Sequence, residues 1–125
     1  ISFWALGEMV RRRLHLAEDD DDATTRERID ATIAEFIADD EDRRWVKPAL
    51  LTLLGLTPAP AGGRDVLFAA WRIFFERVAE RGTTVLLFED LQWADTGLLD
   101  FIEYLLEWSR TSPILVIARC RGRPP

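Results

Sequence analysis

Two adjacent carboxylates after an apolar segment are the strongest chemical feature of the sequence. Glu89 and Asp90 directly follow the segment 83–88, which is β-branched at its start and apolar without alternation. Like charges beside an apolar core destabilise each other unless a cation lies near them. A magnesium ion held by one carboxylate would resolve this conflict, while the second carboxylate orients a water for attack on a terminal phosphate. Glu89 and Asp90 are therefore candidate metal-binding and catalytic residues, and a solvated turn that caps the next helix is the alternative.

A second group of residues that can bind phosphate follows another apolar segment. Arg119 and Arg121 come after residues 114–118. Both segments are short and apolar without alternation, which is typical of strands covered on both faces by helices. A helix is predicted between them at 96–110, with Asp95 as its N-cap. Strand, helix and strand joined by short connections form a right-handed parallel unit, and ligands bind at the carboxyl ends of such strands.

Upstream of this unit, apolar residues recur at steps of three and four and predict four further helices. They span about 3–16, 24–37, 43–54 and 65–81. Thr24 and Glu27 are placed to cap the second helix, and Gly55 to end the third. Prolines and glycines at 57–64 predict a loop. We expect one partial α/β domain, with a helical part at 1–56, this loop, and a helix plus two buried parallel strands at 65–125. The tryptophans on helical faces, Trp4, Trp45, Trp71 and Trp108, are expected in the core.

Composition excludes several classes of protein. The chain has 125 residues, 48% of them hydrophobic, and a net charge of -6, which suits one modest core. No apolar run approaches the roughly 20 residues of a membrane span. A single cysteine, Cys120, and a single histidine, His15, exclude an internal disulfide and a Cys- or His-rich zinc site, and this composition fits a reducing compartment. We expect no membrane partner.

Acidic residues are concentrated at 18–42, a segment that contains twelve carboxylates and two arginines. This surface repels phosphate backbones, so nucleic-acid binding through it is disfavoured. The run 18–22 lacks the spaced acids and the glycine of a calcium loop. We interpret it as a solvated loop.

The segment 85–95, V-L-L-F-E-D-L-Q-W-A-D, resembles the Walker B segment of P-loop ATPases. This form is typical of AAA-like regulatory ATPases of the STAND group, including the origin-recognition-like AAA domain. Most similar are the predicted ATPases attached to adenylate or guanylate cyclases or to LuxR-type regulators. Segments 2–10, 43–51 and 98–103 are also similar to those proteins, so the resemblance covers most of the chain.

The resemblance implies a role for each matching residue. Glu89 occupies the position of the magnesium-associated acid, which is usually Asp in the family. Asp90 occupies the position of the acid that polarises the attacking water. The alternative is that these two residues exchange roles. Gln92 and Asp95 are candidate nucleotide-site residues, with side-chain packing and helix capping as their alternatives. Arg121 falls on the arginine that senses the terminal phosphate. Arg119 is the weaker candidate.

The phosphate-binding motif G-x-x-x-x-G-K-[ST] does not occur in these 125 residues. In the family it lies upstream of the segment that begins at Phe3, so we expect a fragment of a larger cytoplasmic domain. The complete domain is expected to bind ATP and Mg²⁺, to couple hydrolysis to signalling through other domains of the same polypeptide, and to be capable of oligomerisation. The fragment alone is expected to be inactive. A catalytically inactive helical interaction or scaffold module is the alternative.

Overall fold

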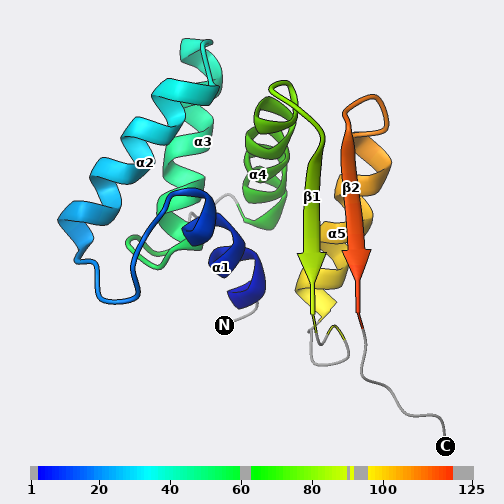
Figure 1. The fold of residues 1–125 in the computed structure, drawn as a ribbon, viewed down its shortest axis with the longest axis horizontal. Helices are drawn as coiled ribbons and strands as arrows, with labels where there is room; N and C mark the ends of the chain where they lie inside the picture. The colour runs from blue at the N-terminus through cyan, green and yellow to red at the C-terminus, as the bar shows by residue number, and fades with distance from the viewer. Residues whose placement is uncertain (1–2, 60–62, 90, 92–95, 120–125) are drawn as a thin grey trace, which may run out of the picture.

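A computed structural model describes residues 3–59, 63–89, 91 and 96–119 of the chain. They form an α/β structure that begins with helices and ends with a strand–helix–strand unit (Figure 1). The elements are α1 (Trp4–Arg13), α2 (Asp22–Phe36), α3 (Asp40–Leu53), α4 (Arg64–Ala79), β1 (Thr84–Phe88), α5 (Thr96–Trp108) and β2 (Ile114–Ala118). The α/β class and the predicted order of elements are confirmed. None of the described helices is long and apolar enough to cross a membrane.

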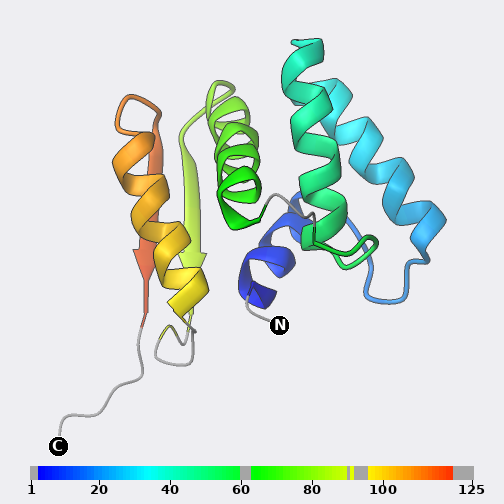
Figure 2. The ribbon, with the colours of Figure 1, turned by 180° about the vertical axis from the view of Figure 1, so that it is seen from behind.

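Strands β1 and β2 pair in parallel, with Thr84 opposite Ile114 and Phe88 opposite Ala118. The Thr84 N–H donates to the Pro113 carbonyl over 2.9 Å at one end of the ladder. Helix α5 runs back along the pair, so both strands point the same way (Figure 2). The predicted parallel unit is confirmed, and the carboxyl ends of both strands lie at one edge of the sheet.

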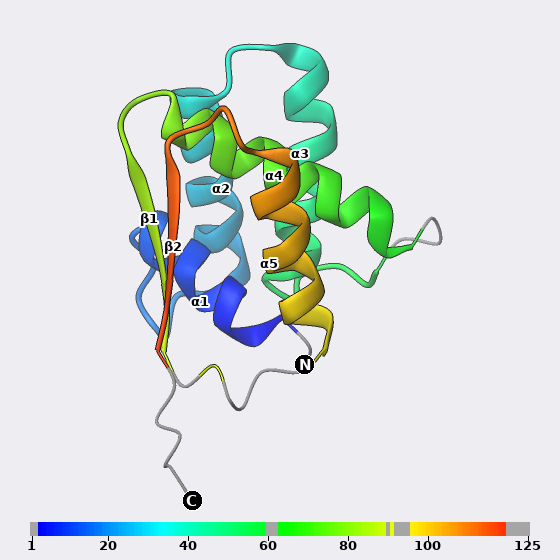
Figure 3. The same ribbon diagram turned by 90° about the vertical axis from the view of Figure 1, so that its right-hand side faces the viewer.

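Among the described residues, helices cover one face of the sheet only, on the side where α4 and α5 lie (Figure 3). Leu86 and Phe88 are 4% and 2% exposed and belong to the core. The other face carries apolar side chains that remain 42–52% exposed, those of Val85, Leu87, Leu115 and Ile117. The prediction of strands buried on both faces is therefore wrong for the described residues. An apolar run without alternation shows that both faces suit burial, but it does not place a helix on each of them.

Helix α4 lies at the centre of the core, between α3 and α5. Its Trp71 is 1% exposed, and the indole N–H donates to the Ala49 carbonyl of α3 over 2.9 Å. The Trp71 ring contacts Phe101 of α5 edge to face, with ring centroids 5.7 Å apart. Such aromatic pairs add to the stabilisation from buried area, so α4 joins the helical part to the sheet unit.

The other three tryptophans that were expected in the core lie on the surface. Trp4, Trp45 and Trp108 are 67%, 51% and 63% exposed. Each belongs to a helix that also supplies buried aliphatic residues to the core, such as Leu6, Val46 and Leu105. The prediction is confirmed for Trp71 alone.

Acidic residues begin two of the helices. The Asp21 carboxylate accepts the Thr24 N–H over 2.8 Å and is the N-cap of α2, so the predicted cap at Thr24 is wrong. This bond lowers the pKa of Asp21 below its ordinary value. Asp39 caps α3 in the same way. The acidic run is thus partly a set of helix starts, because carboxylates are stabilised by the exposed N–H groups there.

Candidate functional site

The candidate site lies where β1 and β2 end. Glu89 follows β1 directly, and Arg119 follows β2. The Arg119 N–H donates to the Phe88 carbonyl over 2.8 Å, and the Leu91 N–H donates to the Arg119 carbonyl over 3.0 Å. These two bonds continue the ladder past the strands and hold Glu89 and Arg119 side by side.

The side chains of these two residues form an ion pair. Arg119 Nη1 lies 3.0 Å from Glu89 Oε1, and the side chains are 68% and 62% exposed. Exposed pairs of this kind contribute about 0–1 kcal/mol to stability. The fold therefore does not depend on the pair, and both groups are available to a ligand.

Of the residues predicted from the sequence, the structure describes Glu89 and places it as expected, at the carboxyl end of β1. Asp90, Gln92, Asp95 and Arg121 lie outside the described residues. Among the described residues, the arginine that contacts the acid is Arg119, which the sequence ranked below Arg121. A signal for this was present, because two parallel five-residue strands in register bring the residues that follow them to the same position.

The start of α5 lies at this same edge of the sheet. The helix begins at Thr96 and runs away from the carboxyl ends of the strands (Figures 1 and 2). The N-terminal end of a helix carries the positive end of the helix dipole, which favours anions. An acid, an arginine and a helix start therefore lie at one end of the unit.

The described residues suit a magnesium ion only where most of its ligands come from waters and substrate phosphates. They contain no group of three or more His, Cys, Asp or Glu side chains that could hold a metal ion. Magnesium is usually bound by one or two carboxylates, with waters and substrate phosphates as its other ligands. Glu89 suits that role, and its carboxylate accepts a hydrogen bond from Arg119 in this structure.

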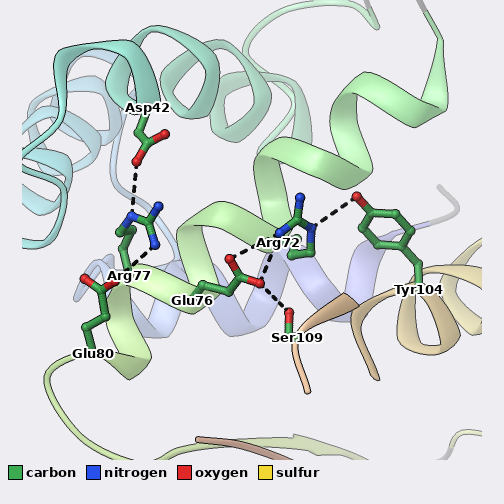
Figure 4. Close-up of polar contacts among 7 residues, drawn as sticks. All are labelled: Asp42, Arg72, Glu76, Arg77, Glu80, Tyr104 and Ser109. Atoms are coloured by element: carbon green, nitrogen blue, oxygen red, sulfur yellow. Dashed lines mark hydrogen bonds and ion pairs between the residues drawn. The ribbon is translucent and has the colours of Figure 1, made fainter. Parts of the chain in front are cut away.

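A polar cluster between α4 and α5 holds the strand–helix–strand unit on α4 (Figure 4). Glu76 of α4 accepts two hydrogen bonds from Arg72 Nη1, over 3.2 and 3.1 Å, and one from the Ser109 hydroxyl after α5 over 2.8 Å. The Arg72 Nε donates to the Tyr104 hydroxyl of α5 over 3.2 Å. Burial alone would lower the pKa of Arg72, but its bonds to Tyr104 and Glu76 outweigh burial and raise that pKa above its ordinary value.

One turn further along α4, Arg77 makes the corresponding link to the helical part. Its guanidinium lies 3.1 Å from Asp42 of α3 and 3.1 Å from Glu80 (Figure 4). None of these residues was predicted from the sequence as functional. The spacings of four between Arg72 and Glu76 and of three between Arg77 and Glu80 were the signals, and such pairs are common on exposed helices.

We compared the chain with protein-family models, curated proteins and solved structures, and none of these matches it.

Proposed function

We propose that this chain carries the strand–helix–strand portion of a P-loop-type regulatory ATPase domain. The observation that supports it best is the placement of Glu89 and Arg119 side by side at the carboxyl ends of two parallel strands. This is the edge at which open parallel sheets bind ligands. A carboxylate and a guanidinium there suit a metal-bound polyphosphate, because the acid attracts the cation and the arginine attracts the anion.

Each residue has a role in this proposal. Glu89 contributes a carboxylate to the magnesium site, and Asp90 orients the attacking water. Arg119 and Arg121 neutralise charge on the terminal phosphate, and Gln92 and Asp95 shape the nucleotide site. Bound Mg²⁺ would supply the charge that offsets the phosphate oxygens.

ATP binding in this proposal requires a glycine-rich phosphate loop from the natural polypeptide, since these 125 residues contain none. The backbone N–H groups and the lysine of such a loop provide most of the affinity for phosphate. Hydrolysis in the complete domain would then drive a cyclase or a transcriptional output. The chain by itself would be inactive.

The test is ATP hydrolysis by the natural polypeptide that contains this chain. Asp90→Asn and Glu89→Gln should each lower the rate about 100-fold or more, as expected on loss of a group that assists proton transfer or metal binding. Glu103→Gln is the matched control, because Glu103 is an exposed acid on α5. An unchanged rate in Asp90→Asn, or a reading frame without a phosphate loop, would refute the proposal.

The scaffold alternative has one observation in its favour, the exposed apolar side chains on the outer sheet face. Mn²⁺ binding to the chain, followed by NMR, distinguishes the ATPase proposal from the scaffold alternative. The ATPase proposal expects paramagnetic broadening of the amide signals of Phe88, Glu89 and Arg119, abolished in Glu89→Gln. Broadening confined to the acidic run 18–22 favours the scaffold.

A further inference from the structure

A groove of about 460 Å³ lies between α3, residues 57–58 and the first turn of α4. The side of α3 that lines it carries positions 44, 45, 48, 51 and 52, which are spaced by three and four residues and so share one helix face. No residue of β1 or β2 is among its described lining residues. The groove is therefore separate from the sheet and from the candidate site at the strand ends, and its volume suits a small molecule.

The floor of the groove is buried and apolar, and its rim is open to solvent. Ala49, Leu51 and Leu67 form the buried part of the lining. Trp45 and Pro48 are exposed at the rim. A concave apolar surface with a few polar groups at its opening is the usual form of a small-molecule site.

Hydrogen bonds hold one wall of the groove in place. The Thr52 and Thr57 hydroxyls are bonded to each other over 3.1 Å, and the Thr52 hydroxyl donates to the Pro58 carbonyl over 3.4 Å. These bonds fix residues 57–58 against α3. The groove is therefore formed without a ligand, and binding does not require this wall to be ordered.

Arg44 supplies the charge of the groove. No acid is among the described lining residues. Asp40 precedes Arg44 by four positions on α3, a spacing that allows an ion pair. Among the described residues, however, no carboxylate forms an ion pair with Arg44. The guanidinium is thus available to an anion that reaches the rim.

We propose that this groove binds a small aromatic carboxylate. The ring of the ligand packs on the Trp45 indole and on the apolar floor, and its carboxylate pairs with Arg44. A guanidinium can hold a carboxylate through two parallel hydrogen bonds, and aromatic rings gain from offset stacking. A flat ring also loses less conformational freedom on binding than a flexible aliphatic chain. The proposal does not rest on ATP binding.

The test is a titration of the natural polypeptide that contains this chain with 2-naphthoate. Binding is followed by fluorine NMR after labelling with 5-fluorotryptophan, and Trp45→Phe identifies the signal of Trp45. That signal should shift with a dissociation constant of about 1 mM or lower. The signal of Trp4, an exposed tryptophan on α1, should not move.

Two other compounds separate the contributions of charge and ring. 2-Naphthamide has the same rings without the charge, and it should bind at least about fivefold more weakly than 2-naphthoate. Octanoate has the charge without the rings, and it should also bind at least about fivefold more weakly.

Variants at the rim test the two assigned contacts. Arg44→Gln should weaken 2-naphthoate binding at least about fivefold and leave 2-naphthamide binding unchanged, because only the carboxylate uses the charge. Trp45→Ala should weaken binding of both compounds, as measured from the proton signals of the ligands. Arg110→Gln and Trp4→Ala are the matched controls, since they remove an exposed arginine and an exposed tryptophan elsewhere. All four positions are exposed, so the variants should fold, and circular dichroism checks this.

Three results would overturn the proposal. The first is no shift of the Trp45 signal up to about 5 mM 2-naphthoate. The second is equal affinity for 2-naphthoate and 2-naphthamide, or full binding of 2-naphthoate by Arg44→Gln, since either shows that no anion is recognised. The third is octanoate binding as tight as that of 2-naphthoate, which would assign the groove to aliphatic acids. Loss of ATP hydrolysis in Asp90→Asn affects none of these measurements, so the two proposals can fail independently.

Discussion

Glu76→Gln tests the polar cluster that holds α5 against α4. The Glu76 side chain is 15% exposed, and that of its partner Arg72 is 24% exposed. The carboxylate accepts three hydrogen bonds, two from Arg72 and one from Ser109. Glutamine keeps one carbonyl acceptor but loses the charge, so the Arg72 guanidinium is left partly buried without a counter-ion.

The size of the effect follows from this burial. Removing one partner of a fully buried ion pair costs about 3–5 kcal/mol, whereas exposed pairs contribute about 0–1 kcal/mol. The pair of Glu76 and Arg72 lies between these limits, so we expect Glu76→Gln to lower the free energy of unfolding by about 2 kcal/mol. Glu80→Gln is the matched control on the same helix. Glu80 is 62% exposed in its pair with Arg77, and the control should lose less than about 0.5 kcal/mol.

Urea unfolding followed by circular dichroism measures both variants. The midpoint of Glu76→Gln should fall while the slope with denaturant stays unchanged, since the surface exposed on unfolding is the same. Equal losses for Glu76→Gln and Glu80→Gln would show that the cluster does not bind α5 to α4 and would refute the reasoning from burial.

Three further predictions follow from the described contacts. Trp71→Phe should lower the free energy of unfolding by about 2 kcal/mol in the same urea assay, because it removes the bond to the Ala49 carbonyl and leaves a small void. Thr24 lowers the pKa of Asp21, so the stability from the Asp21 carboxylate is present above its ordinary pKa of 3.8 and lost as pH falls through the lower folded value. Thermal unfolding of Asp21→Asn should therefore lose less stability than the wild type over this acidic range. Arg119→Met should change urea stability by less than about 1 kcal/mol, because the ion pair of Arg119 is largely exposed.

Local features of the sequence determined the secondary structure. Apolar spacing predicted the helices to within a few residues, and the predicted strand 114–118 coincides with β2. Gly55 ends α3 with a φ of 82°, which glycine adopts without a steric penalty. The position of Glu89 at a strand end was also predictable, because it depends only on where the apolar run stops. Periodicity, turns and caps act over a few neighbouring residues, so they can be recognised in the chain itself.

Tertiary packing decided the surroundings of those elements. An apolar run does not show whether one or both faces of a strand are covered. A tryptophan on a helix does not show which side of that helix faces the core. The ion pair between Glu89 and Arg119 joins residues 30 positions apart, and the bond between Glu76 and Ser109 joins residues 33 positions apart. Residues of α1, α4 and β1 likewise line one groove beside the edge of β1. These features depend on which elements become neighbours, and that depends on how the whole core packs rather than on any local segment.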